Sequence, residues 1–146
     1  VAAELELVEK IGREYFLRDV LAHLPAEYEY VILDCPPSLG LITINALCGA
    51  TDLLIPLQCE YYALEGIAQL MGVVLTMFDK RNKLSHQVET EVRSYFQDKV
   101  FQSIIPRNVR LSEAPSHGLP ALCYDYKCVG TQSYLKLGQE ILALAM

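Results

Sequence analysis

The sequence has 146 residues, of which 52% are hydrophobic and 21% are charged. This composition is typical of a folded globular domain and excludes an intrinsically disordered chain. Because the net charge is −6, any contact with nucleic acid has to come from a local patch of Lys and Arg. No apolar run approaches the roughly 20 residues of a membrane-spanning helix, so no membrane partner is predicted. The five cysteines form no C-x-x-C pair and are typical of reduced thiols, so we predict a cytoplasmic protein.

The first predicted elements are a helix and a strand. Apolar residues recur over 17–24 with the spacing of one helical face, and Pro25 stops the helix. Residues 30–34, YVILD, form a short apolar run without polar alternation, as expected of a parallel strand that is covered on both faces. A further helix is expected near residues 41–48.

The rest of the chain continues this alternation of strand and helix. Apolar runs at 53–57, 73–78 and 100–105 are predicted strands, and residues 62–71, 84–96 and 134–141 are predicted helices. This rhythm predicts an α/β fold, with a mostly parallel twisted sheet and helices on both of its faces. Without an internal repeat or a long linker, residues 1–146 are predicted to form a single domain.

Asp34 stands at the end of a predicted strand, where ligands of α/β proteins bind. A carboxylate at this place can hold Mg²⁺ or its water shell beside a nucleotide. Residues 35–40 contain two prolines and end in Gly40, which suits a loop that moves between two defined states. By itself, an apolar strand ending in Asp more often caps the next helix.

A longer match extends this pattern. The string YVILDCPPSLGLITINAL at residues 30–47 resembles the Walker B and switch II segment of the ParA/MinD group of ATPases with a deviant Walker A motif. The resemblance continues through LLIPLQCEYYALEGIAQL at 53–70 and VFQSIIPRNVRLSEAPSHGLP at 100–120. These segments look like the chromosome-partitioning ParA/Soj proteins. The chain is therefore identified as the C-terminal part of such an ATPase, with a P-loop NTPase-like fold whose N-terminal part is missing.

The resemblance implies roles for three residues around a nucleotide. Asp34 would be the Walker B acid that holds magnesium, and no other metal site is predicted. Pro106 and Asn108 would flank the adenine, and an Asn amide offers a purine edge both a donor and an acceptor. From the residues alone, an ordinary turn after a strand is the preferred interpretation of Pro106 and Asn108.

The resemblance also implies partners. Members of this family bind MgATP, form homodimers, bind DNA without sequence preference on the nucleoid, and respond to a ParB-type partner protein. Arg81, Arg107 and Arg110 follow two neighbouring strands and would contact DNA phosphates. The alternative is that these arginines are only solvated, as surface arginines usually are.

The sequence departs from the family in the phosphate-binding loop. None of its eight glycines is followed by Lys, so no Walker A motif is present and no catalytic set is complete. We therefore expect MgATP binding in the full-length parent and neither bound nucleotide nor ATP hydrolysis for this chain alone. One alternative is a truncated, non-catalytic module that binds DNA or a partner. A MinD-like membrane-associated ATPase is a third reading, but the basic amphipathic tail that it needs is absent.

A second departure lies between Met71 and Gly72. The helix predicted to end at Met71 runs directly into the next predicted strand, whereas family members have a longer connection there. A crossover between parallel strands usually takes a dozen residues or more, so the stretch 59–72 is only just sufficient. We predict a missing segment between these two residues.

Overall fold

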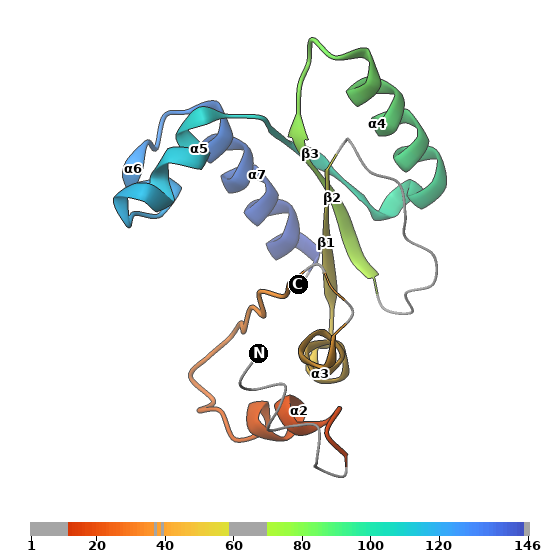
Figure 1. Ribbon diagram of the computed structural model, residues 1–146, viewed down its shortest axis with the longest axis vertical. Coiled ribbons are helices and arrows are strands. Elements are labelled where there is room, and N and C mark those ends of the chain that lie inside the picture. The colour runs from red at the N-terminus through yellow and green to blue at the C-terminus, as the bar shows by residue number, and fades with distance from the viewer. Residues whose placement is uncertain (1–11, 37, 39, 59–69, 145–146) are drawn as a thin grey trace. The chain divides into compact units, whose positions relative to one another are not determined.

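The computed structural model describes residues 12–36, 38, 40–58 and 70–144 (Figure 1). Contacts within the chain divide it into two compact units, Val1–Leu53 and Leu54–Met146. Each unit is described by itself below, and the single domain over residues 1–146 stays a prediction.

The first unit contains helix α2 (Phe16–Leu21) and helix α3 (Leu41–Gly49), which confirm the two predicted N-terminal helices. Asn45 of α3 is 3% exposed and fastens the segment around α2. Its side-chain amide donates to the carbonyl oxygen of Arg13 at 2.7 Å and accepts from the amide of Leu17 at 3.1 Å. A buried Asn is stable here because its polar atoms are paired.

The predicted strand at residues 30–34 is wrong, because these residues have no regular secondary structure. Val31 is 49% exposed and Ile32 is 91% exposed. An apolar run becomes a strand only when neighbouring strands pair with its backbone, and no described segment does so here. Asp34 therefore lies in an exposed irregular segment.

The second unit is built on a three-stranded sheet with the order β1-β2-β3. Its strands are β1 (Leu53–Gln58), β2 (Leu70–Phe78) and β3 (Val100–Pro106), and β2 and β3 are parallel. All three predicted strands are confirmed. The helix predicted at 62–71 is wrong at its last two residues, which belong to β2, and its other residues lie outside those described. Strand β2 runs unbroken through Met71 and Gly72.

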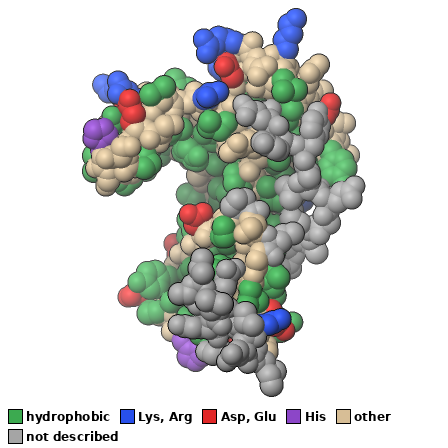
Figure 2. Space-filling model, viewed as in Figure 1, with side chains coloured by type: hydrophobic (Ala, Val, Ile, Leu, Met, Phe, Trp, Pro, Cys, Tyr) green, Lys and Arg blue, Asp and Glu red, His purple; other side chains and the backbone are tan. Residues whose placement is uncertain are grey.

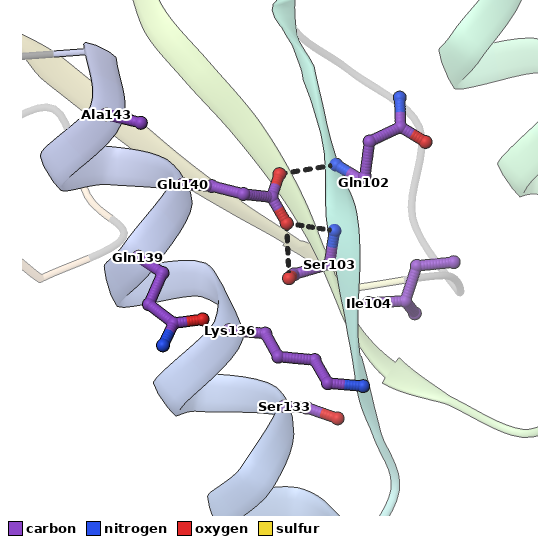
Figure 3. A pocket seen from close by; sticks show the side chains of 8 residues that line it. All are labelled: Gln102, Ser103, Ile104, Ser133, Lys136, Gln139, Glu140 and Ala143. Atoms are coloured by element: carbon purple, nitrogen blue, oxygen red, sulfur yellow. Dashed lines mark hydrogen bonds between the residues drawn. The ribbon is translucent and has the colours of Figure 1, made fainter.

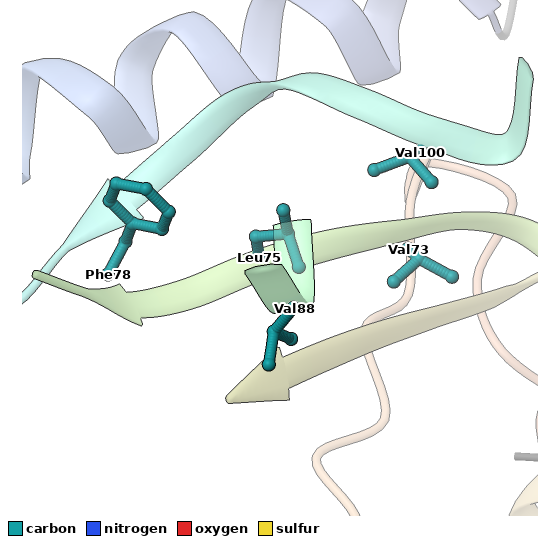
Figure 4. Close-up of a cluster of buried hydrophobic side chains, with 5 residues drawn as sticks. All are labelled: Val73, Leu75, Phe78, Val88 and Val100. Carbon is teal, nitrogen blue, oxygen red and sulfur yellow. The ribbon is translucent and has the colours of Figure 1, made fainter. Parts of the chain in front are cut away.

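A helix covers each face of this sheet, as the sequence predicts (Figure 1). Helix α4 (Lys83–Phe96) packs on one face, where Val88 joins the buried cluster shown in Figure 4. The other members of that cluster are strand residues: Val73, Leu75, Phe78 and Val100. Helix α7 (Val129–Leu144) packs on the opposite face, where Leu137 contacts Val74, Phe101 and Ile105. The α/β fold class is confirmed.

Two irregularities interrupt the pairing of β2 with β3. Residues 73 and 75 of β2 pair with residues 100 and 104 of β3, so β3 has two extra residues in that interval. Residues 75 and 78 then pair with residues 104 and 106, so β2 has one extra residue. That residue brings Phe78 to the same face as Leu75, because a one-residue bulge reverses the alternation of side chains. Met77 beside it has a φ of 55°.

Short helices that the sequence analysis did not predict connect β3 to α7. They are α5 (Val109–Glu113), the 3₁₀ turn η2 (Ala114–His117) and α6 (Ala121–Tyr124). Another 3₁₀ turn, η1 (Gln97–Lys99), joins α4 to β3. Across the residues described, no helix is both long and apolar enough to span a membrane.

Candidate functional site

The carboxyl ends of β2 and β3 meet and bring two predicted groups of residues together. Phe78, the last residue of β2, pairs in register with Pro106, the last residue of β3. The amide of Arg107 donates to the carbonyl oxygen of Phe78 at 3.0 Å. The segments that begin at residues 79 and 107 therefore leave the sheet side by side, and we call them the β2/β3 edge.

Asp79 lies between two of the predicted DNA-contacting arginines. It accepts from the amide of Arg81 at 2.9 Å, and the Arg81 guanidinium approaches the same oxygen at 3.3 Å. These two hydrogen bonds, together with the charges of Arg81 and Arg107, lower the pKa of Asp79 below its ordinary value of 3.8. The Arg81 side chain remains 92% exposed, so its charge is open to solvent.

Asn108 caps helix α5 directly after Pro106 ends β3. Its side-chain oxygen accepts from the amide of Arg110 at 2.9 Å, which is the usual arrangement of an Asn that starts a helix. The structural role of Asn108 is thus a helix cap at the β2/β3 edge. Its predicted position beside an adenine stays a prediction.

Arg110 is held by two carboxylates. Its guanidinium contacts Glu113 at 3.0 Å and Asp125 at 3.6 Å. The hydroxyl of Tyr124 donates to the same Glu113 oxygen at 3.1 Å, and the Tyr124 ring stacks on His117 with centroids 4.9 Å apart. The hydrogen bonds to Glu113 and Tyr124 raise the pKa of Arg110 above its ordinary value.

Lys and Arg side chains gather at the end of the second unit that carries the β2–α4 connection and α5 (Figure 2). The segments that follow β2 and β3 contribute five basic residues to this end: Lys80, Arg81, Lys83, Arg107 and Arg110. All five are exposed. Acidic side chains accompany them, so the patch is only partly positive. Asp125 was missed by the sequence analysis, because its role depends on the way α6 folds back toward α5.

Asp34 lies in the first unit and does not share a described element with the β2/β3 edge. The chain around it is held locally. The Cys35 thiol lies 3.6 Å from the carbonyl oxygen of Leu33, and the Thr43 hydroxyl donates to the carbonyl oxygen of Ser38 at 2.7 Å. Asp34 is exposed to solvent. Its role as a magnesium ligand stays a prediction.

A pocket of about 540 Å³ lies away from all the predicted site residues, between the middle of β3 and α7. Figure 3 shows Glu140 reaching from α7 to β3. Its carboxylate accepts from the amides of Gln102 and Ser103, each at 2.8 Å, and from the Ser103 hydroxyl. These amides belong to the irregular part of β3, so Glu140 compensates for lost strand pairing. Among the residues described, no three His, Cys, Asp or Glu side chains are grouped to hold a metal ion.

Comparison with known proteins identifies the family. A family model described as an AAA domain matches residues 1–86. The chromosome partitioning protein ParA of Myxococcus xanthus is 54% identical over 157 residues, and the match covers 96% of this chain and 56% of that protein. The sporulation initiation inhibitor protein Soj of Bacillus subtilis is 50% identical, and the match covers 97% and 62%. This chain belongs to the ParA/Soj family of chromosome-partitioning ATPases.

The chain spans about 56–62% of the length of these ParA/Soj relatives. The match to the Myxococcus xanthus protein extends over 157 positions, but 96% of this chain is only about 140 residues. About 17 positions of the matched span therefore have no counterpart in this chain.

Solved structures show the same fold. Cobyrinic acid a,c-diamide synthase from Mycobacterium smegmatis is 30% identical with a TM-score of 0.74, covering 97% of this chain and 58% of that one. A structure of the same enzyme with bound ADP and magnesium is 35% identical with a TM-score of 0.62, covering 73% and 51%. The ParA/Soj chain therefore has the fold of a protein that binds a nucleotide with magnesium.

Proposed function

We propose that this chain supplies the magnesium carboxylate and the DNA-binding surface of a partition ATPase that is controlled by MgATP. Asp34 holds magnesium, and Pro106 and Asn108 flank the adenine. In the longer parent protein, ATP binding drives homodimerisation and non-specific DNA binding on the nucleoid, and a ParB-type partner stimulates hydrolysis. The chain alone holds no nucleotide and does not hydrolyse ATP.

The proposal of DNA binding is supported by the way the carboxyl ends of β2 and β3 lie side by side. The bond from the Arg107 amide to the Phe78 carbonyl oxygen puts the Arg81 and Arg107 segments beside each other. Exposed guanidinium groups from two adjoining segments are suited to phosphates along a backbone, where charge gives affinity without base recognition. This fits partition of a chromosome, because the protein has to bind DNA of any sequence.

The missing segment between Met71 and Gly72, which are consecutive residues of β2 in this chain, belongs to the same proposal. Two observations support it. About 17 positions of the matched span in the Myxococcus xanthus relative have no counterpart here, and only residues 59–69 separate β1 from β2. The three strands run in the same direction in Figure 4, and a crossover between parallel neighbours usually takes a dozen residues or more.

The experiment is DNA retention by a chimera. In it, the parts of the Myxococcus xanthus relative that have no counterpart in this chain are added to residues 1–146. We expect retention of non-specific duplex DNA at low salt with MgATP and much weaker retention with MgADP. Retention that is equal with both nucleotides would favour the non-catalytic module, and no retention under either condition would contradict the proposal.

A further inference from the structure

Two carboxylates hold Arg110 in a position that is set by their own contacts with the fold. Asp125 accepts from the amides of Lys127 at 3.2 Å and Cys128 at 3.1 Å through one oxygen, and its other oxygen faces Arg110. Glu113 lies in the same helix as Arg110 and is held by the Tyr124 hydroxyl. Contacts other than those with Arg110 thus help to hold both acids beside it.

The three predicted DNA-contacting arginines differ in how their charges are balanced. Arg110 faces two carboxylates, Arg81 contacts one, and Arg107 makes no ion pair within the part of the chain that the structure describes. The Arg110 side chain is 56% exposed, and those of Glu113 and Asp125 are 39% and 34% exposed. Ion pairs this exposed are weak, so a phosphate can displace them.

We propose that Glu113 and Asp125 compete with DNA phosphate for Arg110 and so limit the affinity of the protein for DNA. This inference rests on the proposed DNA contact of Arg110. DNA has to remove the guanidinium from both carboxylates and then approach two negative charges that stay in place. The cost of this exchange keeps binding weak and readily reversible, as a protein that moves over the nucleoid requires.

The competition predicts whether each substitution strengthens or weakens binding to DNA. Glu113→Gln and Asp125→Asn each remove one negative charge beside Arg110 but keep a side-chain oxygen that can accept the bonds from Tyr124 or from the amides of residues 127 and 128. Each is expected to strengthen binding to duplex DNA by about 3- to 10-fold at low salt, and the double variant by more. Full engagement of one further phosphate steepens the salt dependence of log K by about 0.9.

The test measures binding of the chimera described above, in the presence of MgATP, to a fluorescent random-sequence duplex over a series of KCl concentrations. Asp98→Asn is the matched control, because it removes one exposed negative charge from η1, at the opposite end of β3. A second set combines the double variant with Arg110→Gln. We expect the gain from the double variant to exceed that of Asp98→Asn and to be lost when Arg110 is replaced. Circular dichroism checks that each variant is folded.

The outcomes separate this inference from the proposed DNA contact. If Arg110→Gln weakens binding but the carboxylate variants gain no more than Asp98→Asn, the competition is wrong and the contact stands. If Arg110→Gln has no effect on a chain that binds DNA, the contact itself is wrong, and the inference with it. If neither the unsubstituted chimera nor its double variant binds DNA with MgATP at the lowest salt, both are overturned, since the released Arg110 is expected to bind.

Discussion

The amide of Arg107 donates to the carbonyl oxygen of Phe78 at 3.0 Å and thereby joins the carboxyl ends of β2 and β3. This single bond sets two basic segments side by side, although 29 positions separate the two residues in the chain. Asp79 immediately follows Phe78 and lies near both Arg81 and Arg107. The proposed DNA surface therefore contains its own counter-charges.

Asp79 is expected to titrate below its ordinary pKa of 3.8, because its ionised form accepts from the Arg81 amide and guanidinium. Because the pKa is lower in the folded state, the contact stabilises the folded state above pH 3.8, the ordinary pKa. This stabilisation is lost as the pH falls from 3.8 through the lowered pKa of the folded state. Carbon-detected NMR of the side-chain carboxyl measures the midpoint. Arg81→Gln should move it upward, and a wild-type midpoint at or above 3.8 would refute the interaction.

Glu140→Ala is expected to destabilise the second unit by about 1–3 kcal/mol, because it leaves the amides of Gln102 and Ser103 without their acceptor. Ser103 is only 8% exposed, so water compensates poorly. Urea unfolding monitored by circular dichroism measures the change. The control is Gln139→Ala on the same helix, where the side chain is exposed. Equal midpoints for the two variants would show that the bonds from Glu140 contribute nothing.

Replacing Gly72 or Gly138 by Ala is expected to change the stability of the second unit in opposite directions. A Cβ at Gly72 would overlap the ring of Phe101 in the buried layer between β2 and α7, so Gly72→Ala should cost about 1–3 kcal/mol. A Cβ at Gly138 has no heavy atom within 4 Å, so Gly138→Ala in the middle of α7 should stabilise by about 0.5–1 kcal/mol. Thermal unfolding of both variants checks this. The same sign for both would contradict the packing described here.

Elements with strong local patterns could be predicted from the sequence. The spacing of Val88 with Val92 and Phe96 predicts α4, and the apolar run at 100–105 predicts β3. In both, the buried residues are close in sequence and recur with the period of the element. The run at 30–34 has an equally clear pattern but forms no strand. A strand depends on a partner from elsewhere in a chain, and a local pattern does not show whether that partner is present.

The candidate site was predictable only in part, for a related reason. Arg81, Arg107 and Arg110 were predicted to contact DNA because they follow predicted strands and because the chain resembles ParA/Soj proteins, and this contact stays a prediction. Their counter-charges were not found, since Asp125 reaches Arg110 from 15 residues further along the chain through the fold of α6. Glu140 was missed as well, because its partners lie 37 and 38 residues away. Such contacts leave no periodic signal in the sequence.

The most direct test of the account is the effect of Asp34→Asn on steady-state MgATP hydrolysis by the chimera described above. We predict that this substitution lowers kcat by roughly 10²-fold or more, the scale seen when a group that stabilises transition-state charge is removed. Asp52→Asn, which changes another exposed carboxylate of the same unit, should leave the rate unchanged. An Asp34→Asn chimera that hydrolyses MgATP as fast as the Asp52→Asn chimera would contradict the assignment of Asp34 as the magnesium carboxylate.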